Sequence, residues 1–119
     1  MIRTVLALSP RPGRTRDIVD LFERQRVIEH ALTVDGCHGV EIWEGNGHLL
    51  VVATWDSSDA YQSWLDHPAR NAGNDALNEL LLEPISPAHE GDRYELVLAG
   101  GDSTPRVVRS SALRGAGEP

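Results

Sequence analysis

The chain has 119 residues, which is the size of one domain and leaves no room for a second hydrophobic core. Apolar residues make up 40% and charged residues 24%, a composition typical of globular proteins and not of disordered or fibrous ones. The net charge is −7 and all 11 cationic residues are arginine, so the chain lacks the basic surface that nucleic-acid-binding proteins carry.

The sequence also argues against a membrane or a secreted location. The longest fully apolar run, residues 49–53, is far shorter than the roughly 20 residues of a membrane span. The first residues do not have the pattern of a secretory signal. Because the single Cys37 cannot form a disulfide within the chain, we expect a cytoplasmic protein.

The first predicted elements are a strand and a long helix. Residues 3–8 are apolar on both faces and predict a strand that is buried on both sides. After a turn with two prolines, a helix is expected from residue 15 or 16 to about residue 32. Its apolar stripe at helical spacing consists of Ile18, Leu21, Phe22, Ile28 and Leu32.

A hairpin and two further helices follow. Strands are expected at residues 38–44 and 49–55, joined by an Asn46-Gly47 turn, and the second strand is again apolar on both faces. A short helix at residues 59–65 is interrupted by His67-Pro68, and another helix follows at residues 69–82. The last strong strand is predicted at residues 94–99.

This order predicts one α+β domain of residues 1–100 with the ferredoxin-like β-α-β-β-α-β arrangement, in which helices cover one face of an antiparallel sheet. The strands are apolar on the uncovered face as well, and such a patch marks an interface. We therefore expect a homodimer of face-packed sheets; the alternative is that the C-terminal tail folds back over the sheet. The tail, residues 101–119, is expected to be partly disordered or packed on the partner subunit.

Three short motifs carry a resemblance to a known family. The run Asp-Gly-Cys-His-Gly at residues 35–39 resembles the "P-G-C-x-G" entry to the second strand of antibiotic biosynthesis monooxygenase (ABM) domains, with Asp35 in place of the proline. Residues 54–61 resemble the family's "W-x-S-x-x-A" signature, and residues 64–68 resemble its continuation. The resemblance spans residues 4–98 and implies a dimeric α+β barrel with a small pocket between sheet and helices in each subunit.

The resemblance implies several chemistries. Family members include cofactor-independent oxygenases that convert aromatic polyketide anthrones or phenols to quinones with O₂, and others degrade heme. Trp55 and Tyr61 stand where the quinone-forming branch has pocket residues, but Val51 replaces an Asn of that branch and Asn74 stands near the position of its Arg. Trp64 matches a site residue of the heme-degrading branch, whose axial His is missing here, so we expect no heme.

The side chains themselves leave alternatives open. Trp55, Tyr61 and Trp64 could wall a pocket for a flat substrate, or pack in the core. Gln25 and Glu29 lie in the middle of the helical apolar stripe; they could line a cavity with Glu29 as base, or be solvated beyond the sheet edge.

His67 at the helix break could be a general base near neutral pH, or a loop residue. The histidines show no metal-ligand spacing, and Cys37 is expected to be an inert buried thiol. The candidate catalytic residues are therefore Tyr61, His67 and Asn74, and the candidate substrate-binding residues are Trp55, Trp64, Gln25, Glu29 and Val51. No metal and no cofactor are expected.

The resulting prediction is a monooxygenase of antibiotic biosynthesis that oxidises an aromatic or polyketide-type small molecule with O₂. In such chemistry the substrate itself reduces O₂, so the protein has to position and deprotonate it. The alternatives are a polyketide cyclase or isomerase on the same fold, or an accessory protein that binds a small molecule without changing it, because fold alone does not fix chemistry.

Overall fold

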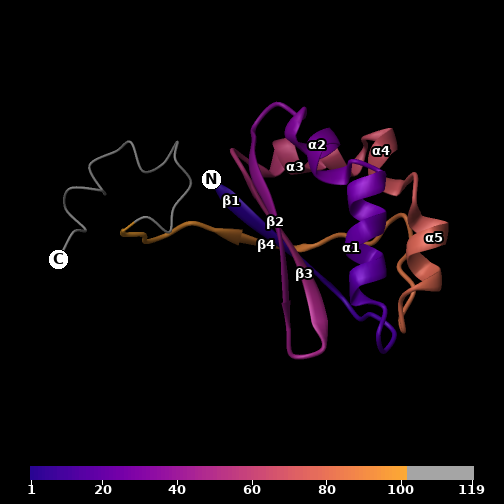
Figure 1. Cartoon of the computed structure of the whole chain (residues 1–119). Coiled ribbons are helices and arrows are strands. Elements are labelled where there is room, and N and C mark those ends of the chain that lie inside the picture. Colours follow the sequence, from indigo (N-terminus) through magenta and orange to yellow (C-terminus); the bar gives the residue numbers. More distant parts are fainter. Residues whose placement is uncertain (102–119) are drawn as a thin grey trace.

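One four-stranded antiparallel sheet carries the helices on a single face (Figure 1). The computed structural model describes residues 1–101, so the predicted tail lies, apart from its first residue, outside the described residues. The sheet order is β2-β3-β1-β4. The strands are β1 (Ile2–Leu8), β2 (Cys37–Gly45), β3 (His48–Trp55) and β4 (Asp92–Glu95). The predicted α+β ferredoxin-like class is confirmed. Among residues 1–101 no helix is both long and apolar enough to cross a membrane.

The helical layer is more broken than the sequence predicts. The expected long helix at residues 15–32 is two helices, α1 (Thr15–Arg24) and α2 (Val27–Leu32), because Arg26 has a left-handed backbone with φ 54°. The predicted helix at residues 69–82 is likewise two short ones, α4 (Pro68–Asn71) and α5 (Asn74–Glu79). Continuous helical periodicity therefore hid both interruptions.

The third helix, α3 (Ser58–Leu65), follows the end of β3 and nearly matches its prediction. Ser57 caps it: the side-chain oxygen accepts the backbone N–H of Ala60 at 3.2 Å. A short link between strand and capped helix therefore fixes where α3 starts, and with it the positions of Tyr61 and Trp64.

The last strand is shifted from its predicted place. The apolar run predicts a strand at residues 94–99, but β4 is Asp92–Glu95 and pairs with residues 2–5 of β1. Gly91 lies so close to the backbone of Val5 that a Cβ there would be 3.0 Å from the Val5 carbonyl carbon. A glycine thus lets the chain join the sheet two residues earlier than predicted.

The pairing of β1 with β3 divides the sheet into two apolar faces. Ile2 pairs with Trp55 and Leu8 with Leu49, and these residues face the helices. On the opposite face Val5 pairs with Val52, and Trp43 of β2 is 57% exposed. A shallow groove of about 460 Å³ on this outer face includes Arg3, Val5, Glu41, Trp43, Leu50 and Val52 among its lining residues. The predicted double-sided apolar character is therefore present in β1 and β3.

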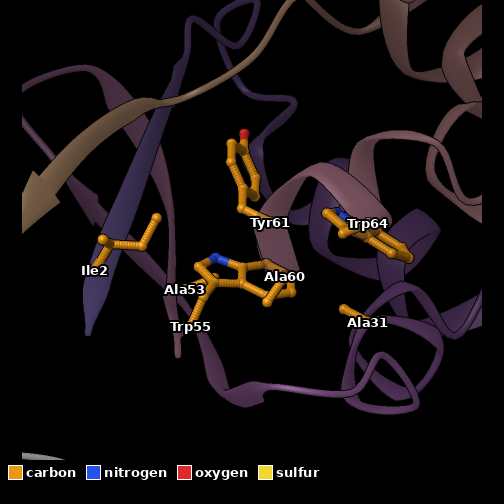
Figure 2. Close-up of a cluster of buried hydrophobic side chains, with 7 residues drawn as sticks. All are labelled: Ile2, Ala31, Ala53, Trp55, Ala60, Tyr61 and Trp64. Atoms are coloured by element: carbon orange, nitrogen blue, oxygen red, sulfur yellow. The ribbon is translucent and has the colours of Figure 1, made fainter. Parts of the chain in front are cut away.

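The core under the helices consists of two clusters. One lies at the end of β3 and contains both buried tryptophans (Figure 2). Its buried members are Ile2, Ala31, Ala53, Trp55, Ala60, Tyr61 and Trp64. The other lies toward the hairpin end and is purely aliphatic at its centre. Its buried members are Leu8, Ile18, Leu21, Leu49, Leu77 and Leu81.

We expect Gly36→Ala to destabilise the fold strongly. Gly36 has φ +94°, and an added Cβ would stand 2.9 Å from the Ala60 Cβ. Left-handed strain and overpacking together should lower the free energy of unfolding by about 2–4 kcal/mol in urea denaturation. The matched control is Gly39→Ala, since a Cβ at Gly39 meets no atom within 4 Å. Equal stabilities for the two variants would contradict this view of the junction between α2 and β2.

Candidate functional site

The predicted aromatic group forms, but as part of the core. Trp55 is 1% exposed, and its indole N–H donates to the Thr4 hydroxyl at 3.0 Å. Its ring lies 5.4 Å from the ring of Tyr61, centroid to centroid, at a tilt of 49°. The structure thus brings Trp55 and Tyr61 together, and the indole N–H already has a partner.

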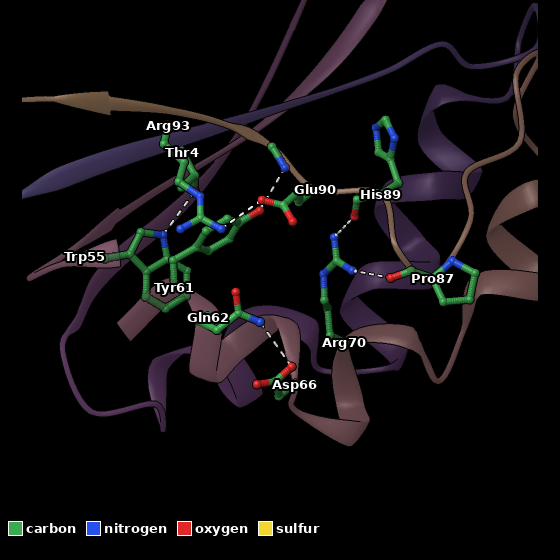
Figure 3. Close-up of polar contacts among 11 residues, drawn as sticks. Thr4, Trp55, Tyr61, Gln62, Asp66, Arg70, Pro87, His89, Glu90 and Arg93 are labelled. Carbon is green, nitrogen blue, oxygen red and sulfur yellow. Dashed lines mark hydrogen bonds and ion pairs between the residues drawn. The ribbon is translucent and has the colours of Figure 1, made fainter. Parts of the chain in front are cut away.

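Tyr61 anchors the segment that leads from α5 to β4. Its hydroxyl accepts the backbone N–H of Gly91 at 2.8 Å, while the tyrosine itself is 4% exposed. The guanidinium of Arg93 lies 5.0 Å from the ring centroid and pairs with Glu90 at 2.8 Å (Figure 3). Through the bond to the Gly91 amide and the contact with Arg93, Tyr61 holds the start of β4 against α3.

Arg70 holds the same segment from the helical side. Its guanidinium donates to the carbonyl of Pro87 at 3.0 Å and also to the carbonyl of His89 (Figure 3). Asn78 of α5 bonds both backbone groups of Ile85, at 2.8 and 2.9 Å. Residues 85–91 therefore form a fastened strap, even though most of them are exposed.

His67 caps a helix. Its Nδ1 accepts the backbone N–H of Ala69 at 3.0 Å at the start of α4, and its ring lies 5.4 Å from that of Trp64. A neutral imidazole that accepts at Nδ1 carries its proton on Nε2, so this geometry presents a donor and not a base. The ring of His30 lies 6.1 Å from that of His67, so the structure places two histidines beside Trp64.

The two interruptions of the helical layer meet at Gln25. An added Cβ on Gly73 would fall 2.0 Å from the Gln25 side-chain oxygen, so the amide occupies the space that the glycine leaves open. Nearby, the Asn74 side-chain N–H donates to the Asn71 side-chain oxygen at 3.0 Å. Asn74 offers an amide, already bonded to a neighbouring one, where the heme-degrading branch has a histidine, so this stretch does not fit a heme.

A cleft of about 340 Å³ lies between the helical layer and the β2 edge of the sheet. Its apolar lining comes from Val19 and Phe22 of α1, Ile28 of α2 and Ile42 of β2. Two carboxylates complete the lining, Glu23 and Glu29. The Glu29 side chain is 54% exposed and lies 4.0 Å from the Arg26 guanidinium. The cleft is therefore an apolar slot with acidic groups at its rim.

Of the candidate residues predicted from the sequence, Glu29 lines this cleft. Val51 is its neighbour, because it pairs with Ile42 across β3 and β2. Tyr61 instead contacts the segment next to β4, and β3 and β1 lie between β2 and β4 in the sheet. The structure therefore does not unite Tyr61 and Glu29 in one pocket.

Sequence reasoning missed most of the residues that line the cleft. Phe22 and Ile28 belong to the predicted apolar stripe, where core packing was the simplest interpretation. Val40 and Ile42 stand on either side of the polar Glu41 in β2, which indicates an inward side chain for Ile42 but not an empty space beside it. The missing signal was the break at Arg26, which lets α1 and α2 surround a slot at the sheet edge.

Cys37 begins β2 and packs against the aromatic cluster. Burial raises the pKa of its thiol above the ordinary value, and a hydrogen bond from the Gly39 backbone opposes part of that rise. A raised pKa keeps the group a thiol at neutral pH, which makes it a weak nucleophile. Within residues 1–101 no group of three or more His, Cys, Asp or Glu side chains is placed to hold a metal ion.

We expect Tyr61→Phe to loosen the strap. The change removes the acceptor of the buried Gly91 N–H, and an unpaired buried donor costs about 1–3 kcal/mol. Urea denaturation should show that loss, and limited proteolysis should cut residues 85–91 faster. The matched control is Tyr94→Phe, at a tyrosine that is 56% exposed, where little change is expected. Identical stability and proteolysis for both variants would show that the hydrogen bond to Gly91 does not stabilise residues 85–91.

Cys37 predicts a pH dependence of stability in alkali. Above the ordinary thiol pKa of 9.0 the unfolded chain loses the Cys37 proton while the folded chain still keeps it. The folded state then binds more protons, so the free energy of unfolding falls as pH rises through this range. Tm measured from pH 7 to 10.5 should fall more steeply for the natural protein than for Cys37→Ala. Parallel slopes would contradict a raised pKa.

Comparison with known proteins supports the fold and the family. The model of the antibiotic biosynthesis monooxygenase family matches residues 1–76. A structure from Mycobacterium tuberculosis is similar with a TM-score of 0.61 at 19% identity, covering 86% of this chain and 98% of that one. No curated protein matches the chain at a significant level.

Two structures provisionally assigned as antibiotic biosynthesis monooxygenases are also similar. The one from Nitrosomonas europaea has a TM-score of 0.67 at 12% identity and covers 82% of this chain and 100% of that one. The one from Bordetella bronchiseptica has a TM-score of 0.65 at 19% identity, with 82% and 97% covered. At such identities the structures show the fold alone, whereas the family model matches more than half of the sequence. The chain belongs to the antibiotic biosynthesis monooxygenase (ABM) family.

Proposed function

We propose that this protein is a cofactor-independent monooxygenase of antibiotic biosynthesis that oxidises a phenolic, polyketide-type small molecule with O₂. The observation that supports this most is the apolar cleft with carboxylates at its rim, between the helices and the sheet. Its volume of about 340 Å³ falls in the range of small-molecule sites. The proposed setting is the reducing cytoplasm, where the single cysteine stays a thiol.

The cleft offers two kinds of contact to such a substrate. Phe22, Ile28 and Ile42 present apolar surface to a flat ring system. Glu29 and Glu23 present proton acceptors at the open side, where a hydroxyl or an acidic ring position of the substrate would lie. The arrangement suits a molecule with an apolar body and one acidic edge.

The proposed chemistry needs a base and an apolar surface that excludes water. Glu29 takes a proton from the substrate, and the resulting electron-rich anion gives an electron to O₂. The two radicals combine with formation of a carbon–oxygen bond, and loss of water leaves a quinone. One oxygen atom of O₂ thus ends in the product and the other in water, with the substrate as the only reductant. The apolar side chains hold the ring in place and keep solvent from it.

We further propose that the protein is a homodimer with its outer sheet faces packed together. Val5, Leu50 and Val52 lie on the face that no helix covers, and Trp43 beside them is 57% exposed. An apolar patch of this kind is typical of an interface between proteins. The alternative occupant of the face is the C-terminal tail, which lies outside the described residues.

The residues chosen from the sequence define a competing location. Tyr61, His67 and Asn74 were predicted as catalytic, beside Trp55, Trp64 and Gln25. In the structure they serve as anchor, helix cap or packing partner, so the cleft is the better place for a ligand. The cyclase, isomerase and binding-only alternatives would use the same cleft, without consuming O₂ in any of the three cases.

The decisive assay is O₂ uptake by metal-free protein with a panel of anthrones and hydroquinones. Glu29→Gln should lower kcat/KM about 100-fold or more, because it removes the general base. Phe22→Leu should raise KM with less effect on kcat. The control is Glu83→Gln, at an exposed glutamate after α5.

The other outcomes identify the alternatives. If Tyr61→Phe abolishes turnover while Glu29→Gln does not, the site is the aromatic cluster and not the cleft. Product formation under anaerobic conditions would indicate a cyclase or isomerase. Tight binding of a phenolic ligand with no chemical change would indicate an accessory protein.

A further inference from the structure

Arg26 has a backbone conformation that its residue type does not explain. Its φ is 54° and its ψ is 42°, in the left-handed region, which is costly for a residue with a Cβ. Among residues 1–101 the other non-glycine residue with a positive φ is Asn46, in the hairpin turn, where asparagine is a favoured type. Strain of this kind is common at binding and catalytic sites. Arg26 thus retains strain that a glycine at this position would relieve.

The strained residue stands between the two groups of side chains that line the cleft. The lining residues of α1 come before it, with Glu23 the last of them, and those of α2 come after it and include Glu29. The Arg26 N–H donates to the Glu23 carbonyl at 3.2 Å, and the Arg26 carbonyl accepts the His30 N–H at 2.9 Å. One left-handed residue therefore joins α1 to α2 and places its own side chain at the rim of the cleft.

Arg26 holds its ion partner loosely. Its guanidinium is 4.0 Å from the Glu29 carboxylate, the longest ion-pair distance in the described part of the chain. The other rim carboxylate, Glu23, is 3.5 Å from Arg16. Both side chains of the Arg26–Glu29 pair are more than half exposed, and a pair of this kind contributes little to stability. The Arg26 guanidinium can therefore turn from Glu29 to another anion at small cost.

The proposed reaction creates such an anion beside Arg26. When Glu29 takes the proton of a phenol, its carboxylate becomes neutral and the negative charge moves to the substrate oxygen. Arg26 then loses the charge of its partner, while a new anion lies next to that partner. A guanidinium that donates N–H groups to this oxygen lowers the free energy of the anion. Proton transfer to Glu29 and the change of partner at Arg26 thus favour each other.

We propose that Arg26 is the anion-binding residue of the cleft: its guanidinium binds the ionised oxygen of the substrate while Glu29 holds the proton. This assignment narrows the ligands to flat apolar molecules with an acidic hydroxyl or a carboxylate at one edge. The catalytic role of Arg26 rests on the proposed function. The binding of anions by Arg26 at the rim does not.

Two naphthalene probes test the anion subsite by calorimetry in the absence of O₂. Hydroxynaphthoate has a flat ring with an ionised carboxylate, and naphthol has the same ring without the carboxylate. Arg26→Gln should weaken hydroxynaphthoate binding about tenfold and leave naphthol binding unchanged, because only the carboxylate needs the cation. Arg26→Lys keeps the charge and should restore part of the affinity. Equal losses for both probes, or no loss for either, would overturn the proposal.

The matched control is Arg24→Gln, which removes the same charge from an exposed residue of α1 outside the cleft lining. Binding of both probes should stay unchanged in this variant. An equal loss of hydroxynaphthoate affinity in Arg24→Gln and Arg26→Gln would show a general effect of charge, and would overturn the assignment of Arg26.

Glu29→Gln should have the opposite effect on anion binding. It removes a carboxylate that repels the probe and competes for Arg26, so hydroxynaphthoate should bind several-fold more tightly than to the natural protein. In a protein that also carries Arg26→Gln this gain should be smaller, because the two side chains are coupled. Additive effects of the two changes would show that Arg26 does not exchange Glu29 for the ligand, and would overturn the proposal.

Stability separates the backbone strain from the charge. Arg26→Gly relieves the left-handed strain and removes the guanidinium, so Tm should rise by a few degrees while hydroxynaphthoate affinity falls as in Arg26→Gln. A variant that is more stable and yet binds the anion more weakly supports a binding role. A fall in Tm together with the lost affinity would show that Arg26 supports the junction of α1 and α2, and would overturn the proposal.

The two proposals fail in different ways. The probes are bound and not oxidised, so anion binding through Arg26 in a protein without oxygenase activity overturns only the proposed function. Turnover of phenols that Arg26→Gln leaves unchanged overturns only the role of Arg26. If both proposals hold, Arg26→Gln should lower kcat/KM for a phenolic substrate, and Arg26→Lys should recover part of it.

Discussion

The antiparallel ladder between β1 and β3 is the constraint on which the rest of the structure depends. It pairs Ile2 with Trp55 at one end and Leu8 with Leu49 at the other, and so sets which side chains face the helices. Because side chains alternate along a strand, a shift of one residue would exchange the inner face for the outer one. The bond from the Trp55 indole to Thr4 forms in this register, in which both residues lie on the inner face. Both core clusters and the apolar outer face follow from it.

The helical layer fits this sheet by breaking in two places. At Arg26 the chain enters α2 at a new angle, so α1 covers the aliphatic cluster and Ala31 of α2 covers the aromatic one. The second break, at Gly73, accepts the Gln25 side chain, so the two interruptions pack against each other. Continuous helices would cross the sheet as straight rods. The broken ones leave the slot between Phe22, Ile28 and Ile42.

The sequence predicts the fold much better than the site. Apolar runs and the Asn46-Gly47 turn place three strands within about one residue, and short motifs identify the family. The break at Arg26 was not predictable from residue type, because arginine is a good helix former and yet has a left-handed backbone here. The last strand was misplaced because hydrophobicity peaks at residues 96–99, whereas the pairing partner of β1 is the polar run Asp92–Glu95.

That misplaced strand and the missed cleft share a physical origin. Strands are predicted from apolar character. Residues 96–99 are apolar, but Val97 and Leu98 are almost fully exposed in their own subunit. Sites are predicted from polar and titratable side chains. The cleft is mainly apolar, and it lies at the edge strand β2. An exposed apolar strand and an open apolar slot at a bare edge are both costly for an isolated subunit, since each leaves surface in water that burial would stabilise.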